Sequence, residues 1–135
     1  MSIRTFLDTS VLIAAFQGND QAHAAAYAIL NDPKREFVTS VFVRLEAGPQ
    51  AFFNKYLTEY QFYEAYFDSC VQMIEASPEL VADAHKEAKR SGLGAMDALH
   101  VAAATDAKAD ELVTVEKRNR PFYRTKRIKV VGIRP

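Results

Sequence analysis

The sequence predicts an α/β protein in which a parallel sheet of about five strands has helices on both faces. Short runs rich in β-branched residues alternate with alanine-rich or amphipathic segments of helical length along the whole chain. This alternation favours parallel strands joined by right-handed crossover helices. No repeat, low-complexity run or Gly/Ser-rich linker interrupts the 135 residues. We therefore expect a single domain over residues 1–135.

The composition is that of a globular protein, with 49% hydrophobic and 25% charged residues. The chain has one cysteine, Cys70, so no internal disulfide can form, which fits a reducing compartment. The amino-terminal residues enter a strand-like run directly, and we expect no signal peptide. The apolar runs are too short to span a bilayer. These features predict a cytoplasmic protein with no membrane association.

Five segments have the composition of β-strands: residues 3–7, 36–39, 71–74, 111–115 and 128–131. The first is followed by three residues of helix N-cap type, Asp8-Thr9-Ser10, and residues 11–16 then form a buried helix. Asp20 opens a second, alanine-rich helix over residues 21–30.

The middle of the chain is predicted to be mostly helical. Residues 41–45 are compatible with an extension of the second strand or with a helix that carries Glu46, and we favour the helix. Apolar residues spaced three and four apart predict one long amphipathic helix over residues 53–67. Its aromatic face is expected mainly to pack inward, and residues 52–67 are also a candidate for part of a partner or dimer groove.

Two further helices have clear signals at their ends. Ser77 followed by Pro78 begins a helix that runs to about residue 90 and stops at Gly92. Another helix starts at Ala95, and its many alanines allow it to pack closely.

Acidic residues follow the predicted strands or begin the helices at one edge of the sheet: Asp8, Glu46, Asp97 and Glu116. In open parallel sheets the ligand lies beyond the carboxyl ends of the strands. Four carboxylates in one crevice would repel each other unless a cation joined them. Oxygen ligands with few histidines favour Mg²⁺ or Mn²⁺ over zinc. The expected chemistry is attack of metal-activated water on a phosphodiester.

Each acid also has a purely structural interpretation. Asp8 could cap a helix, and Asp97 could complement a helix dipole. Glu46 and Glu116 could be surface acids paired with nearby basic residues. Their joint placement at one sheet edge favours a site. His100 lies one helical turn from Asp97 and could orient a carboxylate, but a buried structural histidine is the favoured interpretation.

The carboxyl-terminal region is strongly basic although the net charge of the chain is zero. From Lys117 onward it contains only basic charged residues, and all seventeen acids lie before that point. This uneven charge suggests an anionic partner such as nucleic acid, although a solvated tail explains it equally well. Arg118 and Arg120 closely follow Glu116 and are candidates for contacts with substrate phosphates.

Four segments together resemble the motifs of the PIN-domain family, whose bacterial members include the VapC-type toxins. They are residues 6–13 (FLDTSVLI), 40–46 (SVFVRLE), 94–104 (GAMDALHVAAA) and 112–117 (LVTVEK). The match follows the family's order and covers essentially the whole chain. The first and third motifs are fairly specific together, whereas the second and fourth are weak alone.

The resemblance implies a three-layer α/β/α sandwich and cleavage of RNA that depends on Mg²⁺ or Mn²⁺. It implies that Asp8, Glu46 and Asp97 bind the metal and that Glu116 is a fourth, more peripheral catalytic acid. Many members have aspartate at this last position, so the longer glutamate suggests an indirect contact. Thr114, with Ser10, would support the site. The family further suggests a homodimer and, for a toxin, a small antitoxin partner.

Two other classes of function compete with this hypothesis. A catalytically weak PIN-like module could bind nucleic acid or protein without cleaving RNA. A phosphatase or phosphotransfer domain on a similar sheet is less favoured, because the second aspartate of the phosphatase motif and a glycine-rich phosphate loop are missing. A dehydrogenase is weaker still, for lack of a G-x-G-x-x-G sequence.

Overall fold

The computed structural model describes residues 2–18 and 20–134, and within them five strands form one parallel sheet. The strands lie in the order β3-β2-β1-β4-β5, and each neighbouring pair is parallel. The strands are β1 (Ile3–Leu7), β2 (Arg35–Ser40), β3 (Gln72–Ile74), β4 (Glu111–Thr114) and β5 (Lys129–Gly132). The predicted sheet is confirmed, and every strand end lies within one residue of its expected position.

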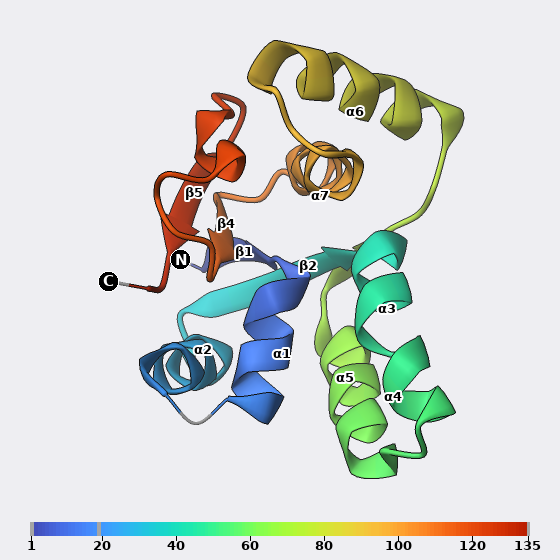
Figure 1. Cartoon of the computed structure of the whole chain (residues 1–135), viewed down its shortest axis with the longest axis vertical. Helices are drawn as coiled ribbons and strands as arrows, with labels where there is room; N and C mark the ends of the chain where they lie inside the picture. Colours follow the sequence, from blue (N-terminus) through green and yellow to red (C-terminus); the bar gives the residue numbers. More distant parts are fainter. Residues whose placement is uncertain (1, 19, 135) are drawn as a thin grey trace.

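Helices cover both faces of the sheet, as Figure 1 shows. The helices α6 and α7 lie together on one face, whereas α1, α2 and the run from α3 to α5 lie on the other. The helices are α1 (Thr9–Gln17), α2 (Gln21–Leu30), α3 (Val41–Ala47), α4 (Pro49–Phe53), α5 (Leu57–Ser69), α6 (Pro78–Ser91) and α7 (Ala95–Asp106). This is the expected three-layer α/β/α arrangement.

The direction in which the chain fills the sheet reverses between β1 and β4. From β1 the chain moves outward to β2 and β3, and α6 and α7 then carry it back to β4 and β5. The connections that follow β1 and β4 therefore leave this edge of the sheet in opposite directions, which is where open parallel sheets form a crevice. Ligands of open parallel sheets bind at such a point.

The core forms where α7 packs on the central strands. Phe6 and Leu112 are fully buried in β1 and β4. On α7, Ala102, Ala103 and Ala104 are also fully buried, and their small side chains let the helix lie close to the sheet and to α6. The close packing fixes the position of the first turn of α7, which carries Asp97.

The start and end of α6 follow the sequence signals. Ser77 accepts a hydrogen bond from the Leu80 amide at 3.0 Å, and Pro78 occupies the first turn. Gly92 ends the helix in the left-handed region with φ of 67°, a conformation that is favourable for glycine because it lacks a Cβ atom.

The prediction of one continuous helix over residues 53–67 is wrong, because α4 and α5 are separate. The Lys55 amide donates to the Phe52 carbonyl and the Tyr56 amide to the Ala51 carbonyl, which is a Schellman ending. Lys55 adopts the left-handed conformation with φ of 62°. Glycine is the usual residue at this position, so the sequence carries no signal for the break.

The region between β4 and β5 contains a short 3₁₀ turn, η1 (Pro121–Arg124), which was not predicted. None of the helices within residues 2–18 and 20–134 combines the length and the apolar character needed to cross a bilayer.

Candidate functional site

The candidate site lies at the crevice between the ends of β1 and β4. Asp8 follows β1 directly, and its main-chain amide donates to the Val113 carbonyl of β4 at 2.9 Å. The main chain of Asp8 is therefore held by the sheet itself, and Thr114 ends the neighbouring strand beside it.

Two hydroxyl groups hold the Asp8 carboxylate by the same oxygen. Ser10 Oγ donates to Asp8 Oδ2 at 2.8 Å, and Thr114 Oγ1 donates to it at 2.9 Å. Although Asp8 occupies the N-cap position of α1, its side chain makes no capping hydrogen bond within the described residues, so its interpretation as a helix cap does not hold. Ser10 and Thr114 lie where supporting residues were predicted.

Glu46 reaches the same crevice from α3, and it is also held by one oxygen. Thr9 Oγ1 lies 2.7 Å and His100 Nε2 lies 2.9 Å from Glu46 Oε1. The hydrogen bond from His100 lowers the pKa of Glu46, with a further contribution from Thr9, against the opposing effect of burial. Glu46 is thus favoured as a carboxylate although 36% of its side chain remains exposed.

Asp97, in the first turn of α7, is the acid whose environment is least favourable for a negative charge. Its pKa is raised, first by burial and next by the nearby charge of Asp8, with Glu116 and Glu46 also raising it and His100 opposing. Asp8, Glu116 and Glu46 are thus near enough to Asp97 for their charges to raise its pKa. The structure therefore brings the four predicted side chains to one crevice.

The side chain of Glu116 is more exposed than those of Asp8 and Glu46. Its amide donates to Thr114 Oγ1 at 3.1 Å, and its carbonyl accepts from the Tyr123 hydroxyl at 2.9 Å. Gly132 makes room for that tyrosine, because a Cβ atom there would lie 2.0 Å from the Tyr123 hydroxyl. The Glu116 side chain is 44% exposed, and its Oε2 lies 3.8 Å from Arg120 Nε. The Glu116 carboxylate therefore lies near the surface beside a basic side chain, and its peripheral role stays a prediction.

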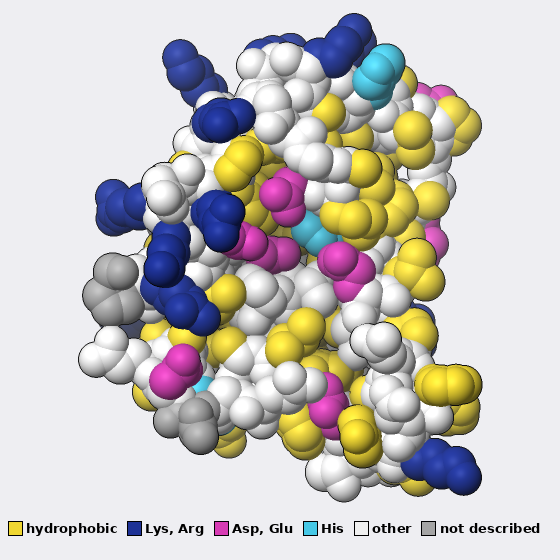
Figure 2. All heavy atoms as spheres, in the orientation of Figure 1, with side chains coloured by type: hydrophobic (Ala, Val, Ile, Leu, Met, Phe, Trp, Pro, Cys, Tyr) yellow, Lys and Arg dark blue, Asp and Glu magenta, His cyan; other side chains and the backbone are white. Residues whose placement is uncertain are grey.

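Figure 2 shows acidic side chains gathered around a histidine in the middle of the face, with basic side chains along one flank. Many of these basic side chains come from the segment between β4 and β5. Exposed basic residues of this segment are Lys117, Arg118, Arg120, Arg124 and Lys126. Arg118 and Arg120 directly follow the site along the chain, so they can contact a polyanion whose scissile group lies at the acids.

The crevice fits a divalent cation that keeps some of its water ligands better than one bound by protein side chains alone. Within residues 2–18 and 20–134, no three His, Cys, Asp or Glu side chains are close enough together to hold an ion by themselves. The acids offer only oxygen atoms, and the pKa of Asp97 is raised by burial and, next, by the negative charge of Asp8. Mg²⁺ usually keeps several waters and takes few protein carboxylates. Asp8, Glu46 and Asp97 are the residues that could hold it.

Two residues of the site were not identified as such from the sequence. Thr9 was considered only as a helix cap, and His100 was favoured as a structural residue. His100 is indeed buried, with 1% exposed, but its ring also contacts Glu46. Its position three residues after Asp97 was the available signal, because that spacing places both on one helix face.

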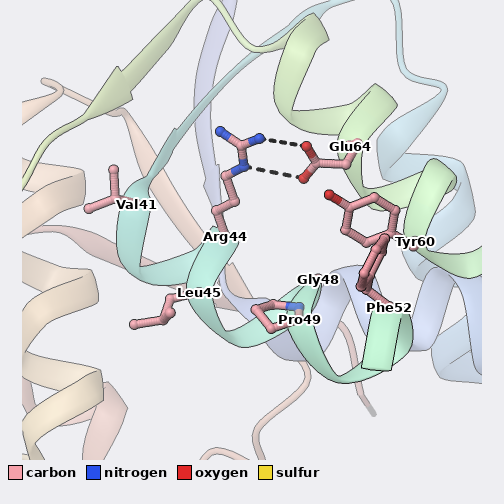
Figure 3. Close-up of a pocket in the computed structure, with 8 residues that line it drawn as sticks. All are labelled: Val41, Arg44, Leu45, Gly48, Pro49, Phe52, Tyr60 and Glu64. Carbon is pink, nitrogen blue, oxygen red and sulfur yellow. Dashed lines mark hydrogen bonds and ion pairs between the residues drawn. The ribbon is translucent and has the colours of Figure 1, made fainter. Parts of the chain in front are cut away.

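A separate apolar groove of about 440 Å³ lies between α3, α4 and α5, and none of the four acids lines it (Figure 3). Phe52 and Tyr60 pack edge to face there, with ring centroids 5.1 Å apart. Arg44 closes one side by donating to both carboxylate oxygens of Glu64, at 3.2 and 2.5 Å. Large exposed side chains, including Leu45 and Phe53, extend this apolar surface. The groove overlaps the segment predicted to form part of a partner groove.

Comparison with known families decides the classification. The sequence profile of the PIN domain matches residues 5–128. The chain belongs to the PIN-domain family. No curated protein compared with it matches.

Solved structures similar to this PIN-domain protein support the fold. A toxin–antitoxin complex from Klebsiella pneumoniae has a TM-score of 0.69 at 21% identity, over 96% of this chain and 98% of the other. VapBC-1 from nontypeable Haemophilus influenzae has a TM-score of 0.69 at 18% identity, over 96% and 98%. FitAcB from Neisseria gonorrhoeae has a TM-score of 0.67 at 15% identity, over 96% and 97%. At these identities the likeness establishes the fold alone.

Proposed function

We propose that this PIN-domain protein is an endoribonuclease that depends on Mg²⁺ or Mn²⁺. The observation that carries the proposal is that Asp8 and Glu46 converge on His100, with carboxylate oxygens 3.9 and 2.9 Å from its Nε2. Asp97 lies near them, and its pKa is raised by burial and by the charges of Asp8, Glu116 and Glu46. A protein maintains such repulsion at a functional site more often than elsewhere. Family membership adds the expectation of nuclease chemistry.

Each acid has a distinct role in this proposal. Asp8, Glu46 and Asp97 bind the ion, and Glu116 acts from the rim, through water. The bound ion would lower the pKa of an attacking water and stabilise charge on the leaving oxygen of the phosphodiester. Ser10 and Thr114 keep Asp8 oriented, and Arg118 and Arg120 hold flanking phosphates without reading sequence.

The test is cleavage of total RNA by the purified chain with Mg²⁺, Mn²⁺ or EDTA. Asp8→Asn and Asp97→Asn should each lower cleavage at least about a hundredfold, since metal-ion stabilisation is worth several kcal/mol. Asp106→Asn is the matched control, because Asp106 is an exposed acid at the other end of α7. This control should cleave like the wild type.

Two outcomes would contradict the proposed nuclease activity. Cleavage that survives both Asp8→Asn and Asp97→Asn indicates a contaminating enzyme. RNA binding without any metal-dependent cleavage by the wild type supports the alternative, a PIN-like binding module.

We further propose that the protein is the toxin of a toxin–antitoxin pair. The structural relatives include toxin–antitoxin complexes, and the groove between α3, α4 and α5 offers apolar surface for an antitoxin segment. Induced expression should arrest growth, and co-expression of a small protein encoded next to the gene should relieve the arrest.

The groove itself can be tested with charged substitutions. Leu45→Asp should weaken the antitoxin complex, whereas Val81→Asp, which alters an exposed side chain on α6, should not. Equal binding by both variants would place the antitoxin elsewhere. A homodimer and a cytoplasmic location remain predictions, which light scattering and cell fractionation would check.

A further inference from the structure

The buried ring of His100 has one polar contact within the described residues. It lies on α7 with 1% of the residue exposed, and it packs against Phe6 with ring centroids 6.1 Å apart. Among the residues that the structure describes, Nδ1 has no hydrogen-bond partner, whereas Nε2 lies 2.9 Å from Glu46 Oε1. Asp8 Oδ1, at 3.9 Å from Nε2, is too distant for a hydrogen bond. The hydrogen-bonding partner of this ring is therefore Glu46.

The chemistry of the two groups fixes the direction of the hydrogen bond. A carboxylate only accepts, so Nε2 must carry the proton and donate to Oε1. Thr9 Oγ1 donates to the same oxygen at 2.7 Å. Within the described residues, no donor contacts Glu46 Oε2. Asp8 has the same arrangement, with both donors on Oδ2 and none on Oδ1 in the described part of the chain.

A glutamate in this position needs such support. Its side chain is long, flexible and 36% exposed, so it loses rotational freedom when it is held in one orientation inside the site. Hydrogen bonds that hold a carboxylate in its binding orientation reduce the cost of assembling the site when the ion arrives.

We infer that His100 is a positioning residue for the metal site: together with Thr9 it holds Oε1 of Glu46 and leaves Oε2 free to bind the ion. This inference rests on the proposed metal-dependent function and identifies how one of its three metal-binding acids is kept in place.

The first measurement is Mn²⁺ affinity by titration calorimetry and by electron paramagnetic resonance. His100→Met replaces the ring with an unbranched apolar side chain that has no hydrogen-bond donor. This variant should lower the Mn²⁺ affinity about 10- to 100-fold. His100→Gln places an amide NH₂ near the position of Nε2 and should retain most of the affinity. Thr9→Val should weaken binding and Thr9→Ser should not. His85→Met, at an exposed position on α6, is the matched control.

The second measurement is the tautomer of His100 by long-range ¹H–¹⁵N NMR in EDTA, at mildly alkaline pH. A proton on Nε2 is expected, and this signature should change in Glu46→Gln, whose amide can also donate. A proton on Nδ1 alone would overturn the inference, because Nε2 could not then donate to Glu46.

The outcomes separate this inference from the proposed function. Equal Mn²⁺ affinity in wild type, His100→Met and His100→Gln would refute the positioning role and leave the nuclease intact. Loss of affinity in His100→Met and His100→Gln alike, at equal stability toward urea, would also refute it. If the wild type bound no Mn²⁺, the proposed function and the inference would both fail.

Discussion

Replacing Thr114 with valine tests whether a hydroxyl in the sheet holds the carboxylate of Asp8. Thr114 is fully buried at the end of β4, and its Oγ1 donates to Asp8 Oδ2 at 2.9 Å. Valine keeps the shape and the β-branched side chain preferred in strands. The substitution therefore removes the hydrogen bond to Asp8 with little change in side-chain shape. The Glu116 amide also loses its acceptor, but it is only partly buried, and water can replace that contact.

The same sheet contains a matched control. Thr39 is also fully buried, in β2, but its hydroxyl has no hydrogen-bond partner among the described residues. A hydrogen bond to a charged group contributes about 1.5–3 kcal/mol, and a buried unpaired hydroxyl costs about 1–3 kcal/mol. We expect Thr114→Val to lower the free energy of unfolding by about 1.5–3 kcal/mol. Thr39→Val should leave it unchanged or raise it.

The assay is urea unfolding in EDTA, so that no ion contributes. With m values of about 1–3 kcal/mol per molar urea, the two variants should differ in midpoint by about 1 M. Thr114→Val should also weaken Mn²⁺ binding, whereas Thr39→Val should not. Equal changes in stability for the two variants would refute the reasoning, because only one of the two hydroxyls is bonded to a carboxylate.

Four further predictions follow from the same contacts. Since burial and neighbouring acids raise the folded-state pKa of Asp97, the wild type should lose stability as pH rises through that pKa. Over the same pH range in EDTA, Asp97→Asn should become more stable relative to the wild type, which urea midpoints measured against pH would show. Mg²⁺ at a hundred times its Kd should stabilise the wild type by about 2.7 kcal/mol, or about 10 °C in Tm, and Asp97→Asn much less, by calorimetry. Replacing Arg118 and Arg120 by alanine should weaken RNA binding and reduce the salt slope by about 0.7 per lost phosphate contact; an unchanged slope in titrations at several salt concentrations would contradict their assignment. Thr125→Val should cost about 1.5–3 kcal/mol in urea unfolding, because its hydroxyl donates to the fully buried carboxylate of Glu87 at 2.9 Å; no loss would mean that this contact does not anchor the basic segment.

Local signals in the sequence were sufficient for most of the fold. The Ser77-Pro78 start and the Gly92 end of α6 depend on hydrogen bonds within one helical turn, which the residues at those positions determine. Strand and helix alternation then limited the topology to parallel pairing. The break at Lys55 escaped prediction because a lysine in the left-handed conformation is stabilised by its surroundings and not by its own preference.

For the candidate site, the sequence by itself determined which acids follow the strands and begin the helices, and therefore which edge of the sheet they share. Only the tertiary structure decided which oxygen each donor contacts. The bond from Thr114 to Asp8 joins residues 106 positions apart, and that from His100 to Glu46 joins residues 54 apart. Contacts at such separations depend on how closely α7 packs on the sheet and on the register of β4 with β1, which no local preference specifies.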